Sequence, residues 1–200
     1  MNTSDAASLI EGAVLQTAKT WADVGAGDGT FTRALVQLLG REARIYAVDR
    51  DARALALLQR WAARDRANVI ALEADFTRSL ELPEPLDGLF VANALHFVKN
   101  LASVLARLVD RLRPGGRVVV IEYDRRRASR WVPYPIDSDR LPEIAAIAGL
   151  TAPTFTATRP SLYGGAIYVA AMDRVGRDSA SVERVSLAQQ PSDEGAEQEI

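Results

Sequence analysis

The stretch Asp23-Val24-Gly25-Ala26-Gly27-Asp28-Gly29 stands between a short apolar run and an amphipathic helical pattern. Its glycines let the chain turn tightly and let a ligand approach bare backbone. The N–H groups at the start of the following helix would then face that ligand. Many strand-to-helix turns carry glycine for steric reasons alone, so the stretch by itself fits a ligand site and a plain turn equally well.

The rest of the chain alternates short apolar runs with helical patterns, which is typical of a sheet with crossover helices. The expected strands cover residues 21–24, 44–48, 69–72, 86–92, 117–123, 154–159 and 166–172. The expected helices cover residues 6–18, capped by Ser4 or Asp5, and 30–39, 51–63, 101–112 and 138–148. The turn at 160–165 is short enough to require a hairpin. We therefore expect a doubly wound α/β fold, with a mostly parallel seven-stranded sheet and an antiparallel last strand.

An acid ends the second expected strand. Asp49 follows Gly29 by 20 residues, and a carboxylate there can accept hydrogen bonds from both hydroxyls of a ribose. Thr30 stands where the dinucleotide pattern G-x-G-x-x-G has its third glycine, which normally allows close packing beneath a pyrophosphate. Asp23 and Asp28 also suit a pyrophosphate badly, because like charges would meet. The pattern favours an adenosine-containing cofactor with a cationic or zwitterionic end.

These residues resemble motif I of the class I S-adenosylmethionine-dependent methyltransferases, whose pattern is acid-x-G-x-G-x-G. The resemblance continues in order over residues 21–172. Asp49 matches the family's ribose-binding acid, Asp75 the acid on the adenine amino group, and Asn93 the carboxyl end of the fourth-strand motif. The segment Leu112-Arg113-Pro114-Gly115-Gly116 is similar to the family's turn before the fifth strand.

The resemblance implies a Rossmann-like methyltransferase fold, S-adenosylmethionine as cofactor, and methyl transfer to a small-molecule acceptor by in-line displacement. It implies the cofactor-binding residues Asp23, Gly25, Ala26, Gly27, Gly29, Asp49, Arg50, Asp75, Phe76 and Asn93. Some of these have plainer interpretations as well. Asp23 could hydrogen-bond loop amides, and Asp75 could be a loop acid in water. Asp28 could be a helix N-cap instead of a ligand contact.

His96, the only histidine, follows the fourth strand. It is the candidate catalytic residue, because histidine suits general-base work near neutral pH. The alternative is that His96 caps or packs beneath the following helix. Methyl transfer from a sulfonium needs little acid–base catalysis by the protein, because the cofactor already contains its leaving group.

The segment after the fifth strand carries charges and aromatic residues. Glu122 and Asp124 fall on one strand face and could orient a polar acceptor. Arginines at 125–127 and 130, with Trp131 and Tyr134, could bind an anionic group, a phosphate or RNA, or could simply form a solvated loop. Prolines at 133 and 135 indicate an ordered lid.

Composition limits the remaining choices. The chain has 200 residues, no cysteine and a formal net charge of −2, so disulfides and thiolate sites are excluded and nucleic acid is not an expected partner. No apolar run reaches the about 20 residues of a membrane span, and Met1 to Thr20 makes a poor signal peptide. We expect a cytoplasmic protein that takes a small-molecule substrate and binds no metal, with a homodimer left open.

Three segments are expected along the chain. They are an entry helix over 1–19, an S-adenosylmethionine-binding domain over 20–175 and an acidic, disordered tail over 176–200. Two other functions stay open besides methyl transfer. One is an NAD-dependent oxidoreductase, against which Thr30 and Pro114-Gly115-Gly116 argue. The other is a non-catalytic cofactor-binding or scaffold protein of the same fold.

Overall fold

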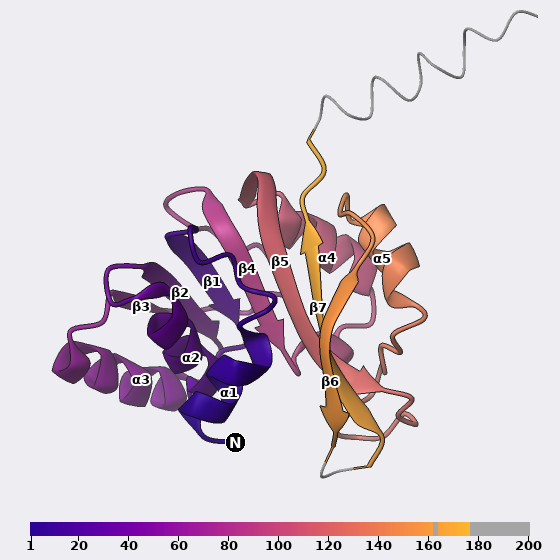
Figure 1. Ribbon diagram of the computed structural model, residues 1–200, viewed down its shortest axis with the longest axis horizontal. Coiled ribbons are helices and arrows are strands. Elements are labelled where there is room, and N and C mark those ends of the chain that lie inside the picture. Colours follow the sequence, from indigo (N-terminus) through magenta and orange to yellow (C-terminus); the bar gives the residue numbers. More distant parts are fainter. Residues whose placement is uncertain (162–163, 177–200) are drawn as a thin grey trace, which may run out of the picture.

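The computed structural model describes residues 1–161 and 164–176 (Figure 1). Its strands are β1 (Thr20–Val24), β2 (Arg44–Asp49), β3 (Val69–Glu73), β4 (Leu86–Ala92), β5 (Leu112–Asp124), β6 (Thr154–Pro160) and β7 (Ala166–Asp173). They form one seven-stranded sheet in the order β3-β2-β1-β4-β5-β7-β6. Strands β1 to β5 run parallel, whereas β7 is antiparallel to both β5 and β6. The predicted fold class, including the antiparallel last strand, is confirmed.

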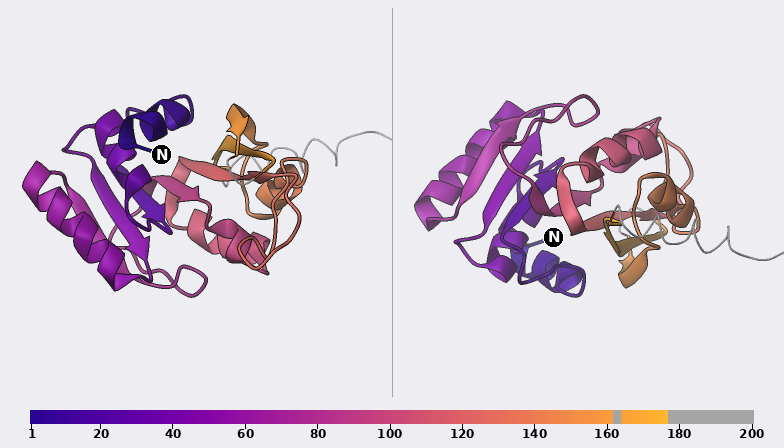
Figure 2. Two further views of the ribbon diagram at one scale, coloured as in Figure 1. Left: turned by 90° about the horizontal axis from the view of Figure 1, so that it is seen from below. Right: turned by 90° about the horizontal axis from the view of Figure 1, so that it is seen from above.

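Helices cover both faces of this sheet, as the views along the strands show (Figure 2). On one face α1 (Thr3–Ile10), α2 (Thr30–Leu39) and α3 (Ala52–Asp65) share a core with Trp21 and Ile45. On the other face α4 (Leu101–Val109) and α5 (Leu141–Ile147) pack over Val91 and Val120. Strands β1 and β4 are largely buried on both faces because helices cover both of them. The carboxyl ends of β1 to β5 therefore lie along one edge of the sheet.

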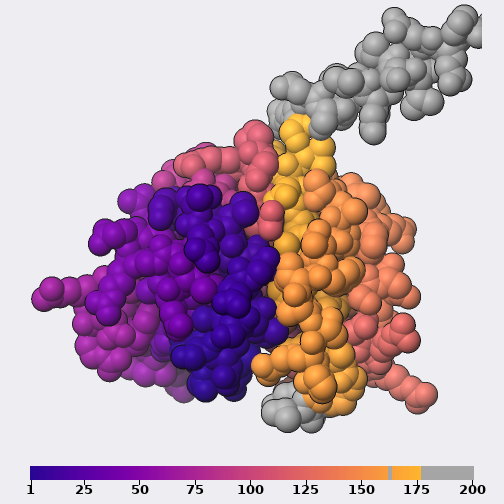
Figure 3. Space-filling view, viewed as in Figure 1, coloured from indigo at the N-terminus to yellow at the C-terminus, as the bar shows by residue number. Residues whose placement is uncertain are grey.

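The predicted entry helix has different bounds. It was expected over 6–18, but α1 spans Thr3–Ile10. The Asn2 side chain, not Ser4 or Asp5, caps it by accepting the N–H of Asp5 at 2.8 Å. Gly12 disfavours continuation of the helix, and the buried Ala13 and Val14 belong to a turn. Helix α1 lies beside β6, where indigo and orange surfaces meet in Figure 3.

The region around Pro114-Gly115-Gly116 also differs from the prediction. These residues were expected to form a turn ahead of a strand that begins at 117, after a helix that reaches 112. Instead α4 ends at Val109 and β5 already begins at Leu112. The register with β4 jumps at this point, so the three residues form a bulge inside the strand. The Gly115 N–H donates to Arg174 O and the Arg174 N–H to Gly116 O, at 3.1 and 2.8 Å, which ties the bulge to the chain after β7.

The last helix is shorter than expected. It was predicted over 138–148, but α5 spans Leu141–Ile147 because residues 138–140 form a turn. The N–H of Ser138 donates to Asp124 Oδ1 at 2.9 Å, which holds this turn against the end of β5. Part of the predicted hairpin turn at 162–163 and the predicted tail from 177 lie outside the described residues.

Candidate functional site

The glycine loop between β1 and α2 is fastened to the end of β2. The N–H groups of Gly25 and Ala26 both donate to Val48 O, at 2.8 and 3.0 Å. The next amide, Gly27 N–H, donates to the Asp49 carboxylate at 2.8 Å. Gly25 has a φ of +77°, and a Cβ there would lie only 2.6 Å from the Cβ of Ala94. Glycine is therefore required where the loop after β1 meets the loop after β4.

A cavity of about 430 Å³ lies at the carboxyl edge of the sheet, against this loop. This volume is within the range of small-molecule pockets, about 300–1,000 Å³. Its walls come from the ends of β1, β2, β3 and β4, and we call it the cofactor pocket. It is lined by Gly25, Asp49, Arg50, Ala74, Asp75, Phe76, Thr77, Asn93, Ala94 and Phe97.

Six of the ten predicted cofactor residues line this pocket, namely Gly25, Asp49, Arg50, Asp75, Phe76 and Asn93. The other four do not line it, namely Asp23, Ala26, Gly27 and Gly29. Four lining residues were not predicted: Ala74, Thr77, Ala94 and Phe97. They directly follow β3 and β4, so the rule that ligands bind beyond the carboxyl ends of strands could have found them.

Two pocket acids already hold their own loops. Asp49 accepts Gly27 N–H on Oδ2 and Asp51 N–H on Oδ1, at 2.8 and 2.9 Å. Asp75 accepts the hydroxyl and the N–H of Thr77, at 2.6 and 3.0 Å, and these bonds lower the pKa of its carboxyl. Both oxygens of Asp49 keep a further lone pair for a ligand donor, whereas Asp75 accepts both Thr77 bonds on Oδ1 and offers its Oδ2. Both acids are thus held in one orientation at the pocket wall.

Asn93 carries an unmatched hydrogen-bond acceptor. Its backbone has a φ of +51°, which asparagine tolerates better than most residues. Its Oδ1 is buried and has no partner among the described residues, although the side chain lines the cofactor pocket. A buried carbonyl without a donor costs about 1–3 kcal/mol. A ligand that brings an N–H or ammonium group would remove that cost, so the wall suits such a group.

Asp23 lies behind the loop and not on the pocket surface. The residue is 1% exposed, and Thr32 Oγ1 donates to its Oδ2 at 2.6 Å. Burial raises the pKa of the Asp23 carboxyl to about 7, the Thr32 hydrogen bond partly offsets this rise, and the charge of Asp49 adds to it. Near neutral pH this carboxyl is therefore close to half ionised, and a nearby cation would favour its charged form.

His96 is buried with Glu122. Its Nδ1 lies 2.8 Å from Glu122 Oε2, and the two side chains are 3% and 1% exposed. Glu122 Oε1 accepts the N–H groups of Leu95 and His96, at 3.0 and 3.2 Å. These residues belong to η1 (Leu95–Phe97), the short 3₁₀ turn after β4. The geometry matches the packing interpretation of His96, and His96 does not line the cofactor pocket.

The segment 125–136, here called the strap, is fixed at several points. Val132 and Ile136 are buried, and the Tyr168 hydroxyl donates to Ile136 O at 2.9 Å. The N–H of Tyr134 donates to His96 O at 2.9 Å, which joins the strap to η1. Arg126 lies over the ring of Tyr123, 4.7 Å from its centroid. The predicted lid is thus an ordered segment beside the cofactor pocket.

The described part of the chain contains no group of three or more histidine, cysteine, aspartate or glutamate residues placed to hold a metal ion. No helix within 1–161 and 164–176 is long and apolar enough to cross a membrane.

Comparisons with known proteins agree with this geometry. Residues 22–116 match the family model described as a methyltransferase domain. A probable cobalt-precorrin-6B C(15)-methyltransferase (decarboxylating) of Methanothermobacter thermautotrophicus is 34% identical over 102 residues, 49% of this chain and 49% of that protein. The chain thus spans about half the length of the curated relatives it matches.

Solved structures share the fold over most of the chain. The 1,6-didemethyltoxoflavin-N1-methyltransferase of Burkholderia thailandensis, with bound 1,6-didemethyltoxoflavin and S-adenosylhomocysteine, has a TM-score of 0.67 at 22% identity, covering 87% of this chain and 78% of that one. The YcgJ protein of Bacillus subtilis has a TM-score of 0.70 at 11% identity, over 86% and 99%. At these identities the likeness shows the fold alone.

The sheet order, the glycine loop and the match to the family model agree with one another. Residues 22–116 are similar to a methyltransferase domain, and the seven-stranded sheet shares its fold with solved methyltransferases.

Proposed function

We propose that this protein transfers a methyl group from S-adenosylmethionine to a small-molecule acceptor by in-line displacement. The observation that carries the proposal is the cofactor pocket, which is lined by the glycine loop, by Asp49 and by Asn93, whose buried Oδ1 has no partner among the described residues. Support for a small acceptor comes from the toxoflavin methyltransferase of the same fold, which was solved with a small heterocycle.

The pocket residues take separate parts in this proposal. Asp49 accepts hydrogen bonds from the ribose hydroxyls, and Asp75 accepts one from the adenine amino group, with Arg50 and Phe76 beside them. Asn93 Oδ1 accepts an N–H of the cofactor. The loop from Gly25 through Ala26 and Gly27 to Gly29 supplies close backbone, and buried Asp23 stabilises the methionine ammonium through its charge.

The chain's own residues have a modest chemical task. When bound, the sulfonium supplies both the electrophilic methyl group and the leaving group. The protein must hold the acceptor in line with the S–CH₃ bond and exclude water. His96 as general base stays a prediction, and its 3% exposed side chain favours a role in holding η1. The cytoplasmic location and a homodimer also stay predictions.

A methyl-transfer screen tests the proposal. The protein is incubated with S-adenosylmethionine labelled in the methyl group and with a panel of phenols, amines, thiols and organic acids, and label is followed into each acceptor. Calorimetric titration with S-adenosylmethionine and with NAD runs beside it. Transfer to at least one acceptor supports the proposal. Binding of NAD but not S-adenosylmethionine would indicate an oxidoreductase, and cofactor binding without any transfer would indicate a scaffold protein.

A further inference from the structure

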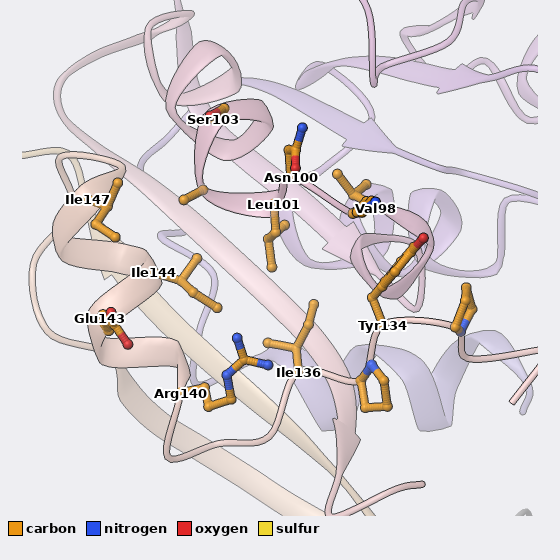
Figure 4. Close-up of a pocket in the computed structure, with 14 residues that line it drawn as sticks. Val98, Asn100, Leu101, Ser103, Tyr134, Ile136, Arg140, Glu143, Ile144 and Ile147 are labelled. Carbon is orange, nitrogen blue, oxygen red and sulfur yellow. The ribbon is translucent and has the colours of Figure 1, made fainter. Parts of the chain in front are cut away.

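A second cavity lies beyond the cofactor pocket, between the start of α4, the strap and α5 (Figure 4). Its volume is about 550 Å³, which is again in the range of small-molecule sites. Polar and apolar surface contribute about equally to its wall, and the apolar part includes the buried Leu101 and Ile136 and, on the facing helix, Ile144. No residue of this wall takes part in cofactor binding as proposed above.

Arg140 is the unusual member of this wall. Figure 4 shows its guanidinium directed into the cavity, toward Ile136 and Ile144. It forms no ion pair with a described residue, Glu143 on the same rim included. A guanidinium beside apolar side chains lacks the carboxylate that would match its fork of N–H donors. The side chain is therefore free to receive an anionic ligand group.

The charges around the cavity point the same way. Lys99 and Arg140 contribute two positive charges to the lining, and Glu143 contributes one negative charge. The apolar part of the wall favours a hydrocarbon or aromatic body, while the net positive charge favours a carboxylate on it. A ligand of this cavity should thus be an organic anion with an apolar body.

The second cavity adjoins the cofactor pocket through the turn after β4. Phe97 lines the cofactor pocket, and the next residue, Val98, lines the second cavity. Tyr134, on the cavity wall, donates its N–H to His96 O at 2.9 Å and so is fixed to the same turn. A molecule held at Arg140 that reaches across this turn would approach the bound cofactor.

We propose that the second cavity is an acceptor subsite, and that the methyl acceptor is an organic anion whose carboxylate pairs with Arg140. The assignment rests on the proposed function, because it takes the occupant to be the molecule that is methylated. It requires an acceptor long enough to extend past the turn formed by Phe97 and Val98.

The test compares 2-naphthoate with its neutral isostere 2-naphthamide, titrated by calorimetry into protein saturated with S-adenosylhomocysteine. Wild-type protein should bind the carboxylate about 10-fold more tightly than the amide. That ratio corresponds to the low end of the free energy that a hydrogen bond to a charged group contributes, as expected at a partly exposed site. Arg140→Gln should reduce that preference to less than about 3-fold. Arg127→Gln makes the same charge change on the strap outside the cavity, and should keep the preference.

The controls separate this proposal from the function it rests on. Arg140→Gln should bind S-adenosylhomocysteine as the wild type does, and 2-naphthoate should bind equally well without the cofactor product. The subsite would be overturned if wild-type protein bound the acid and the amide equally well, or bound neither. It would also be overturned if 2-naphthoate competed with S-adenosylhomocysteine, or if Arg140→Gln kept the full preference for the acid. Failure of wild-type protein to bind S-adenosylmethionine would instead overturn the proposed function.

Discussion

At the scale of single residues, the Asp49 carboxylate joins the cofactor site to the loop that shapes it. Both of its oxygens accept a backbone N–H, from Gly27 and from Asp51. Asp49 also lines the cofactor pocket, where we expect two ribose hydroxyls to donate to its remaining lone pairs. Removal of this side chain should thus weaken binding directly and also release the glycine loop.

Asp49→Ala should weaken S-adenosylmethionine binding by about 30-fold to 1,000-fold. Hydrogen bonds to a charged group are worth about 1.5–3 kcal/mol each, and two on one carboxylate are less than additive, which gives about 2–4 kcal/mol. Calorimetric titration measures it. Asp28→Ala removes an acid of the same loop that bonds Thr30 but does not line the pocket, and should stay within about threefold of wild type. An equally small effect for Asp49→Ala would refute the ribose assignment.

Asp23 makes the stability of the cofactor-free protein depend on pH. Burial raises the pKa of its carboxyl from 3.8 to about 7, so between those values the folded state holds a proton that the unfolded state has lost. Stability contributed by this group is present below about pH 4 and is lost as pH rises to about 7. The loss is at most about 4 kcal/mol, at about 1.36 kcal/mol per pKa unit.

Asp23→Asn should remove this term. The amide can still accept the Thr32 hydroxyl, so the mutant should match the wild type at pH 4 and exceed it in unfolding free energy at pH 8. Urea unfolding of both proteins across this range measures the difference. A difference that stays constant with pH, or a mutant that loses stability at pH 8, would show that Asp23 titrates normally in the folded chain.

At the scale of elements, Glu122 joins β5 to η1, and the backbone of η1 joins the strap. Glu122→Ala would leave three buried N–H donors without an acceptor and should lower the unfolding free energy by about 3–5 kcal/mol. Glu122→Gln can keep both backbone amides on its oxygen and offer its NH₂ to His96 Nδ1, so it should lose much less. Urea unfolding compares the variants.

The histidine tautomer supplies a second readout for the same pair. The chain has one histidine, so ¹⁵N NMR should report Nδ1–H in the wild type and Nε2–H in Glu122→Gln, because the ring then accepts at Nδ1. An unchanged tautomer, or equal destabilisation by alanine and glutamine, would contradict the hydrogen-bond pattern described for Glu122.

The order of elements could be predicted from the sequence because each strand is an apolar run that ends at a polar or glycine-rich turn. Strand β4 and helix α2 have the predicted bounds. Errors arise where tertiary pairing overrides the local pattern. Pro114-Gly115-Gly116 looks like a turn, but Arg174, directly after β7, supplies backbone partners that keep these residues in β5 as a bulge.

The candidate site was likewise predictable only where the local sequence pattern decides the position of a residue. Asp49 and Asp75 could be predicted to line the pocket because each follows the end of an expected strand, as the matching acids do in the methyltransferases that the sequence resembles. The burial of Asp23, and the pairing of Glu122 with His96 across 26 residues, depend on which strands become neighbours. The second cavity could not be predicted either, because α4, the strap and α5 form it together and none carries a motif for it.

At the scale of the whole molecule, the cofactor pocket exists only in the folded chain, since its walls come from the ends of four strands. A ligand that binds only the folded state stabilises it by about 2.7 kcal/mol at 100 times its Kd. For a chain of this length each kcal/mol raises Tm by about 2–4 °C. S-adenosylmethionine at that concentration should therefore raise Tm by about 5–11 °C, as measured by scanning calorimetry.

Two comparisons make this prediction specific. NAD at the same concentration should shift Tm by less than about 1 °C, because Asp23 and Asp28 disfavour a pyrophosphate near the glycine loop. Asp49→Ala should lose most of the shift, since a Kd raised about 100-fold leaves only about 0.4 kcal/mol of stabilisation at the same ligand concentration. Equal shifts from the two cofactors would show that the pocket does not discriminate against the pyrophosphate. A full shift in Asp49→Ala would show that S-adenosylmethionine stabilises the protein from a site other than this strand edge.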